Sequence, residues 1–242
     1  MEFEERAADP LAGGVQYGYQ CGMVWGAALA AGAQAYRLFG TGPQAEAGAM
    51  MAAQRMVASF RAQNRHVNCL EITGIDLSSP TPGMVVGFLL KSAITGSCFG
   101  IAARYAPAAF DEINIAFSEK RVEAPLAPLS CSAILAQKMG ASAMQTVMAA
   151  GFAGGIGLSG GACGALGAAI WILGMNLLKE GGEFTFQAPY AVEVIERFKK
   201  SSGGEFECSK IAGRMFESID DHASYLRDGG CSKIIEALAN HI

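Results

Sequence analysis

The chain contains two related segments, and this internal repeat constrains its fold more than any other feature. Residues 12–27 read AGGVQYGYQCGMVWGA and residues 153–169 read AGGIGLSGGACGALGAA. With one gap allowed, both carry AGG, a β-branched residue, a glycine-bearing turn, Cys-Gly and a run of small residues. Self-similarity of this kind indicates a duplicated supersecondary unit. We therefore predict two tandem copies of one helical unit.

Three cysteines recur in the same order in both copies, with similar spacing and similar flanks. They are Cys21, Cys69 and Cys98 in the first copy and Cys163, Cys208 and Cys231 in the second. A fourth cysteine, Cys131, opens the second copy 32 residues before Cys163, and its counterpart would fall before residue 1. We therefore expect the first unit to lack its opening helix.

The repeat also predicts the domain organisation. The segment VEAPLAPL over 122–129 contains two prolines and is typical of a linker. We expect a shortened first unit with a C-terminal extension over 1–121 and a complete four-cysteine unit over 130–242. A unit of about 110 residues is large enough to hold its own core. The two units are expected to pack with pseudo-twofold symmetry.

Composition favours helices throughout the chain. Glycine (31) and alanine (42) make up about 30% of the residues, which is too much for a β-sandwich or barrel and suits closely packed helices. Apolar periodicity predicts helices at 22–39, 44–64, 83–104, 108–118, 131–150, 163–179, 189–201, 208–218 and 230–240. One alternating run, EFTFQAP over 183–189, is too little for a sheet. We expect an all-α protein of Gly/Ala-rich helices.

Charge and hydropathy exclude some classes of protein. The net charge is −4 and no basic run exceeds the pair at 199–200, so a nucleic-acid binder is not expected. Two uncharged stretches, 11–36 and 139–178, are long enough to span a bilayer, but glycines interrupt both, so buried core helices are favoured over membrane association. The start MEFEERAADP lacks the pattern of a signal peptide, and we expect a cytoplasmic protein without stable disulfides.

Most of the cysteines stand where a predicted helix begins. Cys21 precedes GMVWGAALAA, Cys163 follows Gly-Gly-Ala and Cys231 follows Gly-Gly, whereas Cys98 lies inside an apolar run. A helix N-terminus carries about half a positive charge and unpaired N–H groups, which stabilise thiolates or an anionic cluster that they ligate. Successive cysteines are 23 to 48 residues apart and no CxxC occurs. Any shared site must therefore be assembled from several helix ends.

The second copy resembles a known family. Cys131, then CGALGA from Cys163, then Cys208 and Cys231 are similar to the pattern of the C-GCAxxG-C-C family, whose members are small, all-helical and described as redox-active. The resemblance covers about 126–242 well and about 11–104 as a weaker copy. Ala168 replaces the second glycine of the signature. The resemblance implies that the working groups are Cys131, Cys163, Cys208 and Cys231 and, through the repeat, Cys21, Cys69 and Cys98.

Three functions are compatible with these cysteines. Soft thiolates suit iron–sulfur clusters, and with the resemblance they predict an iron–sulfur redox protein that passes electrons to a partner, as a subunit of a larger complex. One alternative is a metal-free thiol or persulfide redox protein. The other is a structural subunit of a helical assembly in which the cysteines are buried filler.

The remaining polar residues point to little other chemistry. His222, beside Asp220 and Asp221, is interpreted as part of a solvated loop. His66, three residues before Cys69, could be an auxiliary ligand, but its polar surroundings favour a surface position. The glycines over 154–164 lack the GK[ST] of a phosphate loop, and close packing around Cys163 explains them better.

Overall fold

The computed structural model describes residues 2–78, 97–118, 126–183 and 188–240, together with isolated positions between 81 and 90. Within these ranges the regular structure is helical, apart from two isolated antiparallel bridges, and the all-α prediction is confirmed. The helices of the first unit are α1 (Glu2–Arg6), α2 (Gly22–Phe39), α3 (Pro43–Gln63), α4 (Cys69–Thr73) and α6 (Ser97–Ser118). Those of the second unit are α7 (Cys131–Lys138), α8 (Ala143–Ala150), α9 (Gly164–Lys179), α10 (Pro189–Ser202), α11 (Cys208–Ile211), α12 (Ile219–Arg227) and α13 (Ser232–Ala239).

Two predicted helices of the second unit are interrupted where local capping residues override the apolar periodicity. The helix expected over 131–150 breaks at Gly140, whose φ of 74° is left-handed, and restarts as α8. Ser142 and Gln145 form a capping box at that restart. The helix expected over 208–218 ends at Ile211, and Ser218 caps the separate helix α12.

In the first unit the predicted break between 104 and 108 does not occur. Helix α6 is continuous through Pro107. The prediction for 83–104 falls partly, and that for EFTFQAP largely, outside the described residues. The two predicted helices that flank the first bend, 22–39 and 44–64, match α2 and α3 closely.

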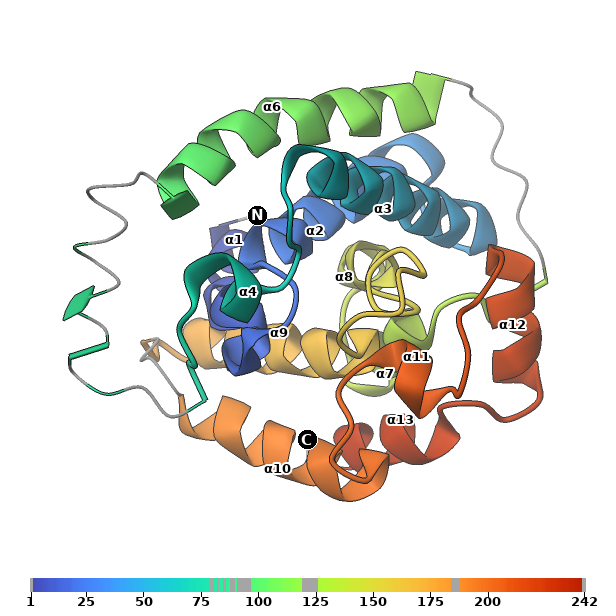
Figure 1. Ribbon diagram of the computed structural model, residues 1–242. Coiled ribbons are helices and arrows are strands. Elements are labelled where there is room, and N and C mark those ends of the chain that lie inside the picture. Colours follow the sequence, from blue (N-terminus) through green and yellow to red (C-terminus); the bar gives the residue numbers. More distant parts are fainter. Residues whose placement is uncertain are drawn as a thin grey trace.

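The two units pack through reciprocal contacts (Figure 1). Helix α2 of the first unit lies against α8 of the second, and α9 of the second unit lies against α1 of the first. In the sequence repeat, α1 corresponds to α8 and α2 corresponds to α9, so each unit contributes the same pair of contacts. Trp171 Nε1–H donates a hydrogen bond of 2.9 Å to the Glu4 carbonyl and fixes α9 on α1. These two equivalent contacts are what a pseudo-twofold arrangement of the units requires.

Small residues allow this close approach, as their abundance predicted. A Cβ on Gly32 of α2 would lie 2.4 Å from the Met148 Cα of α8, so the two backbones are in direct contact. A Cβ on Gly167 would overlap the ring of Trp25, which is fully buried and packs edge-on against Phe152 at 4.8 Å. Larger side chains at either glycine would separate the units.

A left-handed loop precedes Cys21 in the first unit and Cys163 in the second. Residues 13–16 have φ values of 50–70°, and residues 154–158 have φ values of 54–76°. Val15 and Ile156 occupy the same place in the two loops, although β-branched residues rarely adopt this conformation. Because each such residue costs about 1–2 kcal/mol, the surrounding packing must hold both loops in place.

No helix in the described part of the chain combines the length and apolar character that crossing a bilayer requires.

Glu46, in the first turn of α3, gives the fold a measurable pH dependence. Burial raises the pKa of its carboxyl to about 7. Between about pH 4.5 and 7 the unfolded chain ionises this group while the folded chain does not, so folding stability falls as the pH rises through this window. In urea unfolding we expect Glu46→Gln to be about 2 kcal/mol more stable than the wild type at pH 8 and no more stable than the wild type near pH 4.

The matched control for this prediction is Glu193→Gln, because the Glu193 side chain is 67% exposed. It should change stability little at either pH. An equal gain for Glu46→Gln at pH 4 and pH 8 would contradict the assignment to the buried carboxyl.

Candidate functional site

The two antiparallel bridges bring the cysteines together in pairs. In the first unit Gln20 pairs with Asn68, the Cys21 N–H donates to the Val67 carbonyl at 2.9 Å, and the Cys69 N–H donates to the Tyr19 carbonyl at 2.6 Å. Each bridge joins two segments distant in sequence immediately before a helix. Cys21 and Cys69 therefore stand side by side at the starts of α2 and α4.

The second unit repeats these hydrogen bonds at equivalent positions. Ala162 pairs with Glu207, the Cys163 N–H donates to the Phe206 carbonyl at 2.8 Å, and the Cys208 N–H donates to the Gly161 carbonyl at 2.6 Å. Identical backbone geometry around two cysteine pairs supports the duplication inferred from sequence.

Cys98 joins Cys21 and Cys69, and we refer to these three residues as the first cluster. Cys98 lies in the first turn of α6 and not in the middle of an apolar helix, so it follows the same rule as the others. Burial, with the neighbouring Cys21 and Cys98, raises the pKa of the Cys69 thiol to about 11. Tyr105, two turns further along the same side of α6, is also close enough to Cys21 for the two to interact electrostatically.

The second cluster contains the four cysteines of the second unit, Cys131, Cys163, Cys208 and Cys231. Each stands at a helix start: Cys131 and Cys208 are the first residues of α7 and α11, and Cys163 and Cys231 directly precede α9 and α13. Burial raises the pKa of Cys163 to about 12, and burial with the charges of Cys163 and Cys131 raises that of Cys208. Cys131 thus belongs to the site of its own unit.

Cys131 differs electrostatically from the other three cysteines. The S–H of Cys231 donates to its sulfur, and this contact, together with His222 and the N–H of Gly154, lowers the pKa of Cys131 well below its ordinary value despite complete burial. The same contact, together with burial, raises the pKa of Cys231. The contact therefore favours a thiolate at Cys131 and a protonated thiol at Cys231.

His222 was interpreted as part of a solvated loop, and that interpretation is wrong. The residue is fully buried in the first turn of α12, because it shares the apolar face of that helix with Ile219 and Leu226. Its Nδ1 lies 2.8 Å from the Leu129 carbonyl, which fixes Nδ1 as the donor. Nε2 is buried without a hydrogen-bond partner among the described N and O atoms. Burial alone would lower the pKa of His222, but the adjacent Cys131 raises it.

The position of His222 was recoverable from the sequence. Ser218 is a capping residue, and Ile219, His222 and Leu226 have the i, i+3, i+7 spacing of one helix face. The adjacent pair Asp220 and Asp221 suggests solvent exposure, but these residues lie on the other face of the helix from His222.

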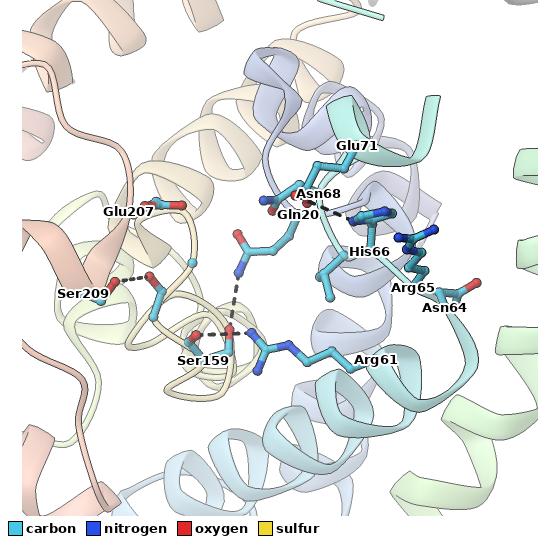
Figure 2. A pocket seen from close by; sticks show the side chains of 13 residues that line it. Gln20, Arg61, Asn64, Arg65, His66, Asn68, Glu71, Ser159, Glu207 and Ser209 are labelled. Atoms are coloured by element: carbon cyan, nitrogen blue, oxygen red, sulfur yellow. Dashed lines mark hydrogen bonds and ion pairs between the residues drawn. The ribbon is translucent and has the colours of Figure 1, made fainter. Parts of the chain in front are cut away.

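His66 is half-exposed, as its polar surroundings predicted. Its Nδ1 lies 3.7 Å from Glu71 Oε1 and its side chain is 41% exposed. It lines a polar cleft of about 510 Å³ between the two units (Figure 2). The other residues that line this polar cleft are Gln20, Arg61, Asn64, Arg65, Val67, Asn68, Glu71, Ser159, Gly160, Gly161, Glu207 and Ser209.

Gln20 forms the floor of the polar cleft and ties the units together. Its Nε2 donates to the Gly155 carbonyl at 2.8 Å, and its Oε1 accepts from the Ala162 N–H at 2.5 Å. The side chain is almost fully buried. Gln20, one residue before Cys21, therefore holds the left-handed loop that leads to Cys163.

The Cys131–Cys231 pair leads to a prediction for the metal-free, reduced chain. At neutral pH it should carry a thiolate at Cys131, visible as a step of ultraviolet thiolate absorbance in a pH titration. Cys231→Ala should move this step to higher pH, because it removes the S–H donor, and His222→Gln should move it less. Cys163→Ala is the control, because the thiol it removes stays protonated at neutral pH. A step that persists in Cys131→Ala would show that the thiolate lies elsewhere.

All seven cysteines are free of disulfide bonds. Within the described ranges, no three side chains among histidine, cysteine, aspartate and glutamate are arranged to hold a single metal ion.

Comparison with known proteins identifies the family. No curated protein and no solved structure matches the chain. One family model, described as "Putative redox-active protein (C_GCAxxG_C_C)", matches twice, over residues 2–106 and 130–242. These matches reproduce the two-copy layout and support a general redox role. The chain therefore belongs to the C_GCAxxG_C_C family and carries two copies of its domain.

Proposed function

We propose that the second cluster binds an iron–sulfur centre through its cysteines and that the protein passes electrons. The observation that carries this proposal is the convergence of four cysteines, three of them buried and Cys231 partly buried, from the starts of α7, α9, α11 and α13. Iron–sulfur clusters are held by sets of four thiolates of this kind. The donor set contains only sulfur, with His222 beside it, and this suits iron–sulfur chemistry.

The surroundings of the second cluster favour thiolates that are bound to an iron–sulfur centre over free thiolates. The N–H groups of Leu166 and Ala165 point at the sulfur of Cys163, and that of Gly154 points at Cys131. Hydrogen bonds to sulfur and exclusion of water are the main protein contributions to a cluster's potential. A cluster spreads its ligands over several iron atoms, so its cysteines need not converge as closely as ligands of one ion. When bound, such a group would supply one-electron redox chemistry.

The first cluster offers the three cysteines Cys21, Cys69 and Cys98. A three-cysteine set can hold a cluster that has one position filled by another ligand or left open. We propose that this site is also occupied. A redox partner protein, a larger complex and a cytoplasmic location stay predictions.

The test is chemical analysis of protein purified without oxygen. Iron and acid-labile sulfide in near-equal amounts, with broad visible absorbance that decreases on reduction, are expected. Their ratio to protein reports whether one or both units are loaded. A colourless protein without iron or sulfide would refute the proposal, and zinc alone would favour a structural metal site.

One observation favours a second candidate, a metal-free dithiol redox protein. The contact between the two sulfurs lowers the pKa of Cys131 and raises that of Cys231, which favours the thiolate–thiol pair that disulfide exchange requires. This function predicts reversible loss of two thiols on mild oxidation of iron-free protein. Reaction would be slow, because Cys131 is 2% exposed.

A further inference from the structure

The polar cleft has the dimensions and location of a ligand site that the cysteines do not account for. Its volume of about 510 Å³ lies within the range of small-molecule sites. One wall comes from the first unit, over residues 61–71, and the other from the second unit, with Ser159–Gly161, Glu207 and Ser209. Figure 2 shows Arg61 reaching from α3 toward Ser159, with His66 on the wall opposite Glu207 and Ser209.

The lining of the polar cleft carries two arginines and two glutamates, which balance formally, but the arginines form no ion pair with the other described residues. Glu207 is paired with Lys210 at 2.6 Å, and Glu71 has His66 as its neighbour. Among the described residues, Arg61 and Arg65 form no ion pair, and the one hydrogen bond of the Arg61 guanidinium is a 3.4 Å contact to the Ser159 carbonyl. Two guanidinium groups thus remain available to an anionic ligand, for which arginine is the preferred partner.

We infer that the polar cleft binds a small molecule bearing a carboxylate or an inorganic oxyanion, recognised by Arg61 and Arg65. The amide of Asn68 and the hydroxyls of Ser159 and Ser209 supply neutral hydrogen-bonding groups along the same walls. A ligand larger than a bare oxyanion fits the volume, with its anionic end at the arginines.

The polar cleft is also placed to serve the redox sites. Its lining includes Gln20, Asn68 and Glu207, each directly before a cysteine, in the two bridges that pair the cysteines. Side chains alternate in extended backbone, so the sulfurs lie on the other side of these bridges. A ligand would be separated from both clusters by about one layer of backbone. Anion binding itself is independent of the proposed iron–sulfur function, whereas a role for the ligand as redox substrate rests on it.

Isothermal titration calorimetry of the full chain, purified without oxygen in a low-salt chloride buffer, tests this inference. Inorganic phosphate and succinate are the probes, one for oxyanions and one for carboxylates, and binding of at least one at millimolar or lower concentration is expected. Arg65→Gln and Arg61→Gln should each weaken that binding about tenfold, the effect of losing one charge-assisted contact. Arg37→Gln is the charge-matched control, because Arg37 is exposed on α2 outside the polar cleft.

Iron and sulfide are measured in the same samples, so that the two proposals fail separately. The inference is supported when Arg65→Gln keeps its iron and loses affinity while Arg37→Gln keeps both. It is overturned when neither probe binds, when Arg37→Gln weakens binding equally, or when Arg65→Gln loses iron. Protein without iron that still binds the probe through Arg65 would refute the iron–sulfur proposal and leave the anion site intact.

Discussion

Replacing Cys163 by alanine should remove the iron and acid-labile sulfide of the second unit completely and leave those of the first unit in place. Cys163 is 5% exposed, and its sulfur accepts the N–H groups of Leu166 and Ala165 at the start of α9. The result is read as iron and sulfide per chain and as the loss of one component of the visible spectrum.

Three variants make this experiment decisive. Cys21→Ala should instead remove the iron and acid-labile sulfide of the first unit, because Cys21 is the residue of the repeat equivalent to Cys163. The double variant should be colourless. Ser209→Ala, beside Cys208, removes only a hydroxyl that donates to the Gly160 carbonyl at 3.0 Å and should retain full iron. If Cys163→Ala keeps stoichiometric iron and an unchanged melting temperature, the second cluster does not hold the metal.

Much of the fold was predictable because the repeat and the helix boundaries are encoded locally. Gly-Gly pairs before Cys163 and Cys231 and the small residues after Cys21 marked helix starts that the structure reproduces. The order of the cysteines shows which of them correspond between the two copies, but it does not show that Cys21 lies beside Cys69 or Cys163 beside Cys208. The physical basis of this pairing is the two bridges, whose partners are 48 and 45 residues apart and share no periodic signal.

The parts of the site that sequence analysis missed depend on tertiary contacts. The polar cleft exists only because the two units pack with Gln20 against the loop over 154–158, and no motif in either copy reports this contact. The charges of Asp220 and Asp221 suggest a solvated loop, whereas the spacing of Ile219, His222 and Leu226 places His222 on the buried face of α12. The low pKa of Cys131 arises from partners 91 and 100 residues away in the chain, His222 and Cys231.

The largest effect on stability is expected for Gly157→Ala, in the left-handed loop that precedes Cys163. Gly157 has a φ of +54°, and a Cβ there would lie 2.3 Å from the Gln54 nitrogen and 2.6 Å from the Ala53 carbonyl carbon, both within α3. The left-handed conformation costs an alanine about 1–2 kcal/mol, and overpacking against rigid backbone adds about 1–3 kcal/mol. We expect a loss of about 3 kcal/mol in urea unfolding, together with loss of iron from the second unit.

Gly203→Ala separates the two contributions. Gly203 has a similar φ of +67° at the end of α10, but nothing lies within 4 Å of a Cβ placed there. It should therefore cost only the conformational part, about 1 kcal/mol, and leave the iron content unchanged. The difference between the two variants measures how tightly α3 of the first unit holds the loop that leads to Cys163. If Gly157→Ala lowers the free energy of unfolding no more than Gly203→Ala does, the packing of the two units does not hold that loop in its left-handed conformation.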